Sequence, residues 1–106
     1  MVYLLIKPSS KNRTFLKNIL SDFNLTEAKK IKKIEDTTKH DVKAVEYYLK
    51  SKIEGNSQLK IYKEFLHIFC TSEDINNLAY ALMIREGVNI LSIELGKITK
   101  LLKQYS

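Results

Sequence analysis

Apolar residues recur at helical spacing along most of this chain. Val42, Val45, Leu49 and Ile53 fall at i, i+3, i+7 and i+11, which predicts an amphipathic helix with one buried stripe. Near the end of the chain, apolar residues step by four, three, four and three positions, which is typical of a coiled-coil seam. These residues are Leu91, Leu95, Ile98, Leu102 and Tyr105. The pattern predicts an all-α fold.

Polar residues that cap helices divide this pattern. Three segments have the form of a capping box, a short polar residue followed three positions later by an acidic one. They are Asn24 to Glu27, Thr38 to Asp41 and Thr71 to Asp74. The apolar segment 59–69 predicts a buried helix. Gly87 stands where a residue just past a helix C-terminus belongs, so we expect a break there and a separate helix over about 90–104.

Chain length fixes the scale of the fold. The 106 residues, 12.3 kDa, suffice for one small domain, so we expect a single multi-helix domain over residues 1–106. Short loops favour packing between neighbouring helices. The apolar seam of the last helix needs a partner, either elsewhere in this chain or on another subunit.

The net charge of +6 is confined to a basic segment, residues 1–34, which holds eight basic and two acidic side chains. A solvated helix face is one interpretation, and binding to nucleic acid or to an anionic membrane surface is the other. The chain has no aromatic ladder, zinc finger or glycine-rich phosphate loop, so we do not expect nucleic acid as a partner.

Other classes of protein are disfavoured by composition. The early apolar run from Val2 to Ile6 is far shorter than the roughly 20 residues of a membrane span, so we expect no membrane association. The single cysteine, Cys70, fits a reducing compartment, and we expect the cytoplasm. The sequence has no residue spacing that is typical of metal ligands, so we expect neither a metal nor a cofactor.

Two helix starts carry candidate chemistry. Thr71 and Ser72 place two hydroxyls at a helix N-terminus, where unpaired backbone N–H groups suit a carboxylate or phosphate. The alternative is that they only cap the helix, and the neighbouring Glu73 and Asp74 oppose an anion.

Histidines provide further candidates. With Thr38 as the cap, His40 lies in the first turn, where it can donate to an anion or shuttle a proton, or remain an exposed residue. Adjacent helix residues do not face each other, so we expect Asp41 to cap the backbone rather than orient the His40 ring. His67 lies in an apolar run, which is more typical of a core histidine than of a catalyst.

Two sequence strings resemble a known family. They are HDVKAVEY at residues 40–47 and CTSEDINNLAYALM at residues 70–83. Together they closely resemble the N-terminal part of the adenylosuccinate lyases, in the fumarase/aspartase superfamily. The resemblance is strong over about residues 31–84 and looser after residue 85. It implies the helical N-terminal region of that superfamily, without its long central helical bundle.

The resemblance also implies an activity. The family cleaves adenylosuccinate to AMP and fumarate, and splits the succinyl-carboxamide ribotide of purine synthesis, both by β-elimination. It implies that Lys39, His40, Asp41, Thr71 and Ser72 contact a polyanionic substrate, and that His40 and His67 are supporting active-site histidines. It implies no cofactor, and a homo-oligomer for the full-length family.

Several family motifs do not occur in these 106 residues. The Thr-His-Gly-Gln motif of the general acid, the Ser-Ser-x-Met-Pro-His-Lys motif of the base and the N-terminal Arg-Tyr motif are missing. Lys39 also stands where similar bacterial members often carry Asn. We therefore expect a truncated portion that holds part of the substrate site and is inactive alone. The alternative is a small helical interaction or oligomerisation protein derived from the lyase.

Overall fold

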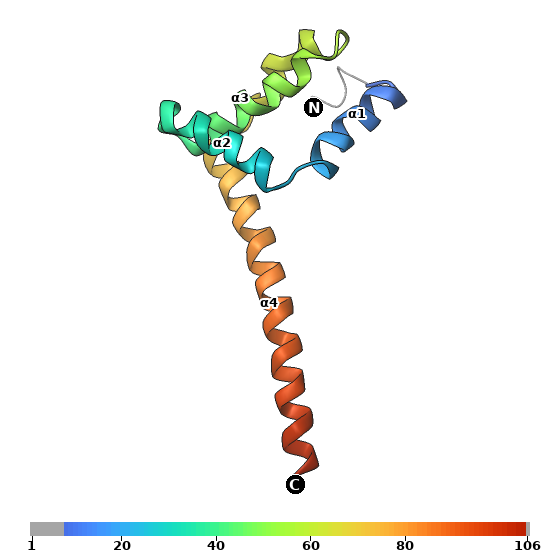
Figure 1. Ribbon diagram of the computed structural model, residues 1–106, viewed down its shortest axis with the longest axis vertical. Coiled ribbons are helices and arrows are strands. Elements are labelled where there is room, and N and C mark those ends of the chain that lie inside the picture. Colours follow the sequence, from blue (N-terminus) through green and yellow to red (C-terminus); the bar gives the residue numbers. More distant parts are fainter. Residues whose placement is uncertain (1–7, 106) are drawn as a thin grey trace. The chain divides into compact units, whose positions relative to one another are not determined.

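The computed structural model describes residues 8–105, and these residues form helices and connecting turns with no strand. The elements are α1 (Ser10–Ser21), α2 (Leu25–Thr38), α3 (Asp41–Glu54), the 3-10 helix η2 (Lys60–His67) and α4 (Ser72–Gln104) (Figure 1). The prediction of an all-α fold is confirmed. The apolar run at residues 2–6 lies outside the described residues.

The chain divides into two compact units, Met1–Phe69 and Cys70–Ser106. In the first unit, α3 packs against both α2 and η2. Its core consists of Val42, Ala44, Tyr48 and Ile53 from α3, joined by Leu59. Of the predicted stripe on α3, Val42 and Ile53 are buried in this core, and Val45 and Leu49 are half-buried. The single domain expected over residues 1–106 stays a prediction.

Local capping explains where the first helices begin. Ser9 accepts a hydrogen bond from the Asn12 N–H and starts α1. The Asn24 side chain accepts from the N–H groups of Thr26 and Glu27, at 2.9 and 3.2 Å, and starts α2 as predicted. Each cap satisfies N–H groups that have no partner inside the helix.

The predicted cap at Thr38 is wrong. Helix α2 continues through Thr38, and Lys39 then adopts a left-handed backbone with φ 52°. This conformation ends α2 by sending the Lys39 N–H back to the Glu35 carbonyl at 2.7 Å. His40 then takes the extended backbone of a cap, so α3 starts two residues later than the pattern suggests.

Glu27 joins α2 to α3. Its carboxylate accepts a hydrogen bond from the Tyr48 hydroxyl at 2.6 Å and pairs with Lys52 at 2.7 Å, both from α3. Lys30, one turn along α2, pairs with the other oxygen at 2.6 Å. Lys30, Lys52 and the Tyr48 hydroxyl hold the pKa of Glu27 at about 2, below its usual 4.5. One carboxylate thus fixes two helices against each other.

The segment after α3 is only partly as predicted. It forms a 3-10 helix over Lys60–His67 rather than an α-helix. Leu59 is buried, but Tyr62 is 37% and Phe69 is 78% exposed. In a 3-10 helix the side chains repeat every three residues, so positions spaced at three and four do not share a face. The expectation of a buried helix over residues 59–69 is therefore wrong, although Leu59 is buried.

The second unit consists mainly of α4, which runs without a break from Ser72 to Gln104 (Figure 1). The predicted break at Gly87 is wrong. One glycine inside a helix costs only about 1 kcal/mol relative to alanine, and no proline follows to stop the helix. The seam predicted over 90–104 therefore belongs to the same helix. None of the helices described is long and apolar enough to cross a membrane.

Substitution of Gly87 tests this continuity. Space for a methyl group is open at both Gly87 and Gly96. We therefore expect Gly87→Ala and the matched control Gly96→Ala to stabilise α4 equally, each by up to about 1 kcal/mol. Urea unfolding followed by circular dichroism measures both. If Gly87→Ala is destabilised while Gly96→Ala is stabilised, the continuity of α4 at Gly87 is contradicted.

Candidate functional site

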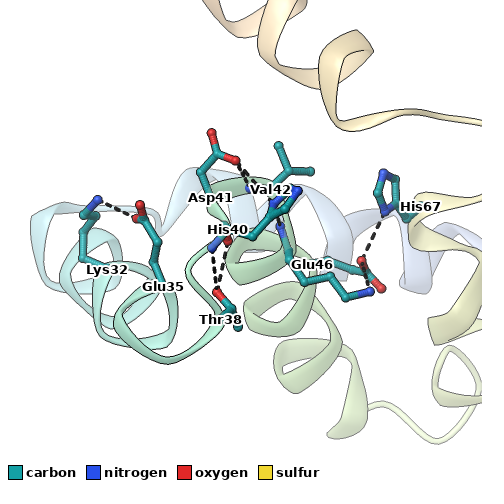
Figure 2. A network of polar contacts seen from close by, with 9 residues as sticks. Lys32, Glu35, Thr38, His40, Asp41, Val42, Glu46 and His67 are labelled. Carbon is teal, nitrogen blue, oxygen red and sulfur yellow. Dashed lines mark hydrogen bonds and ion pairs between the residues drawn. The ribbon is translucent and has the colours of Figure 1, made fainter.

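The turn between α2 and α3 presents three of the predicted site residues in succession, Lys39, His40 and Asp41. Thr38 closes this turn, because its hydroxyl donates to the His40 carbonyl at 3.1 Å and accepts from the His40 N–H at 3.4 Å (Figure 2). The exposed Lys39 is held in its left-handed conformation between them. The three side chains therefore stand at the N-terminus of α3.

His40 is itself the cap of α3 rather than a first-turn residue. Its Nδ1 accepts a hydrogen bond from the Lys43 N–H at 3.2 Å. Nδ1 also lies 3.5 Å from the Asp41 carboxylate. The two contacts need opposite protonation states, and the shorter one requires a lone pair on Nδ1. A neutral His40 ring thus carries its proton on Nε2 and is a donor there.

Asp41 caps the backbone, as predicted. Its Oδ1 accepts a hydrogen bond from the Val42 N–H at 2.7 Å, which satisfies an N–H at the start of α3. The carboxylate also complements the positive end of the helix dipole.

Thr71 and Ser72 lie at the start of α4 in the second unit. The Thr71 hydroxyl accepts from the Asp74 N–H at 3.2 Å and donates to the Asp74 carboxylate at 2.8 Å. The Thr71 N–H donates to the same carboxylate oxygen at 2.7 Å. The predicted capping box is confirmed, and these two donors of Thr71 lower the pKa of Asp74. Asp74 thus engages the N–H and the hydroxyl of Thr71 at this helix start.

His67 is part of a polar network that reaches α3. Its Nδ1 lies 3.2 Å from the carboxylate of Glu46, which is only 8% exposed (Figure 2). Lys50 and Lys43 pair with the same carboxylate at 2.9 and 3.0 Å. These lysines and His67 hold the pKa of Glu46 at about 2, with Lys50 contributing most. The Nε2 atom of His67 is buried with no hydrogen-bond partner among the described residues.

Glu46 is the functional candidate that sequence reasoning missed. It lies four residues after Val42 and three before Leu49, so it interrupts the apolar stripe of α3. A carboxylate on a core-facing position requires a buried partner, which was the available signal. The partner, His67, lies 21 residues away and could not be identified by spacing.

The structure places the predicted site residues in two groups. Lys39, His40 and Asp41 lie with His67 in the first unit, and Thr71 and Ser72 lie in the second. The convergence of the two helix starts on one ligand therefore stays a prediction. Among the described residues, no group of His, Cys, Asp and Glu is placed to hold a metal ion.

The basic segment is partly neutralised where the structure describes it. Lys30 pairs with Glu27, and Lys32 pairs with Glu35 one turn along α2. A groove of about 710 Å³ between α2 and α3 has Lys30, Lys33 and Lys52 in its lining. Two of these three lysines share Glu27. This pairing favours the solvated-face interpretation, and the absence of a nucleic-acid partner stays a prediction.

Comparison with known sequences adds a family relation. The sequence model of a family described as lyase matches residues 7–106. The chain is 53% identical over 103 residues to an adenylosuccinate lyase of Legionella pneumophila (strain Corby), covering 92% of this chain and 22% of the relative. It is 46% identical over 102 residues to the enzyme of that name from Haemophilus influenzae, with the same coverage.

A third relative matches a shorter stretch. The adenylosuccinate lyase of Escherichia coli (strain K12) is 52% identical over 71 residues, which is 67% of this chain and 16% of the relative. The chain thus spans about a fifth of the length of the relatives that it matches over most of its own length.

Proposed function

This chain belongs to the lyase family, and on that basis we propose that it supplies part of the substrate site of an adenylosuccinate lyase. The reaction is the β-elimination of fumarate from adenylosuccinate, leaving AMP, and from the related succinyl-carboxamide ribotide. A base removes a proton next to a carboxylate, and charge develops on that carboxylate. Fixed donors aimed at it stabilise the transition state.

The observation that carries the proposal is the hydrogen bond that His40 accepts at Nδ1 at the start of α3. With Nδ1 engaged by the Lys43 N–H, a neutral ring is a donor at Nε2. The ring stands at the positive end of a helix, next to Lys39 in the sequence, and its side chain is about half exposed. This arrangement suits a carboxylate or phosphate of the substrate, with Asp41 shaping the helix start.

Thr71 and Ser72 supply the second set of donors in this proposal. Their hydroxyls and the N–H groups of the first turn of α4 are the kind of donors that bind a carboxylate. Because the Asp74 carboxylate already accepts from Thr71, substrate binding includes its displacement. His67 is a supporting histidine of the same site.

The general acid and base of the elimination come from residues outside this sequence. Neither the Thr-His-Gly-Gln motif nor the Ser-Ser-x-Met-Pro-His-Lys motif occurs among the 106 residues. The chain alone therefore contributes binding and no turnover. We place the activity in the cytoplasm, where the single exposed cysteine stays reduced.

A chimera tests the proposed function. We expect the Legionella pneumophila enzyme to keep releasing fumarate when its matching 103 residues are replaced by this chain. In that chimera, His40→Asn preserves a capping side chain but removes the ring donor, so kcat/KM falls by about 10²- to 10³-fold. Asp36→Asn, at an exposed position of α2, is the control and leaves the rate unchanged. A folded chimera without activity, or one indifferent to His40→Asn, contradicts the proposal.

A second candidate function follows from α4. None of its described side chains is buried, although it carries large apolar residues on most of its circumference. A helix that is apolar nearly all round normally packs inside an assembly. We therefore also propose that α4 is an oligomerisation surface, in line with a homo-oligomeric lyase.

Light scattering during size-exclusion chromatography tests this second candidate. We expect the chain to elute with the mass of two or more copies and Leu91→Lys, in the middle of the apolar surface, to shift it toward a monomer. Lys97→Gln, at an exposed polar position of the same helix, serves as the control. A monomeric mass at high concentration rules this candidate out.

A further inference from the structure

The contact between Glu46 and His67 limits the proton positions on the His67 ring. The carboxylate lies 3.2 Å from Nδ1, and Nε2 is buried without a partner among the described residues. A proton on Nε2 alone would set the Nδ1 lone pair against the carboxylate. A proton on both nitrogens would leave a charged, buried N–H at Nε2 without an acceptor, which is costly. A proton on Nδ1 alone avoids both problems.

Neighbouring charges keep Glu46 ionised and in place. Lys50 reaches it from the next turn of α3 and also pairs with Glu64 of η2 at 2.6 Å. Lys43 approaches from the preceding turn. The carboxylate thus has two cationic partners and can accept the Nδ1–H of His67 without leaving its own charge unpaired.

We propose that Glu46 is a positioning residue that holds neutral His67 with its proton on Nδ1 and its lone pair on Nε2. A histidine held in this way by a carboxylate has a fixed ring orientation and a fixed tautomer. That His67 supports the substrate site rests on the proposed function, whereas the tautomer does not.

The chain contains two histidines, and the structure assigns them opposite tautomers. His40 accepts from a backbone N–H at Nδ1 and carries its proton on Nε2. His67, 3.2 Å from Glu46 at Nδ1, is by this proposal the donor there and is unprotonated at Nε2. Each ring is therefore an internal reference for the other in one spectrum.

Nuclear magnetic resonance of the ¹⁵N-labelled full chain at neutral pH tests the tautomers without ligand. Two-bond ¹H–¹⁵N correlations should show His67 protonated at Nδ1 and His40 protonated at Nε2. In Glu46→Gln, Lys50 holds the amide oxygen, and the NH₂ group takes the place of the oxygen that Lys43 and His67 share, so the His67 proton should move to Nε2. Glu54→Gln is the matched control, since Glu54 of α3 pairs with Lys60 and Lys63 and with no histidine.

A wild-type His67 that is protonated at Nε2 overturns the assignment, whether or not Glu46→Gln folds. So does a folded Glu46→Gln variant with an unchanged His67 tautomer. In the active chimera described above, Glu46→Gln and His67→Gln should each lower kcat/KM by at least about tenfold, and the double variant should lose no more than His67→Gln alone. Additive losses contradict a role through His67, while the activity of the parent chimera tests the proposed function separately.

Discussion

Two carboxylates, each shared by two lysines, organise the first unit around α3. Glu27 of α2 accepts from Tyr48 and Lys52 of α3, and Glu46 of α3 contacts His67 of η2. Over residues 8–105 the buried apolar core comprises only five residues, so apolar packing alone specifies little about how the helices face each other. Removing Glu27 would take the paired carboxylate from both Lys30 and Lys52, and removing Glu46 would take it from Lys43, whereas Lys50 keeps Glu64.

The same interactions connect scaffold to chemistry. Glu46 fixes η2 against α3 and, through Nδ1, the ring of a proposed active-site histidine. At the start of α3, the cap that satisfies the helix is His40, so its structural bond decides which ring nitrogen donates. At both histidines, a contact that holds a helix in place therefore also sets the position of the ring proton. A variant that removes such a contact should change which ring nitrogen is protonated.

Local signals predicted the fold better than the site. The caps at Asn24 and Thr71 depend on contacts within three residues, and both are confirmed. The cap at Thr38 failed because the left-handed Lys39 is a backbone choice that side-chain pattern does not encode. Glu46 was missed because its partner is distant in sequence. The family resemblance supplied the substrate roles of Lys39, Asp41, Thr71 and Ser72, which stay predictions.

The pH dependence of unfolding tests most directly whether these carboxylates organise the unit. Both have a pKa of about 2 in the folded chain, below the usual 4.5. Their stabilisation is therefore present above pH 4.5 and is lost as the pH falls toward 2. The free energy of unfolding of the wild type, measured in urea, should fall over that pH interval. It should fall less for the double variant Glu27→Gln/Glu46→Gln, and Asp36→Asn, the control, should follow the wild type. Identical pH profiles for the wild type and the double variant would contradict the account.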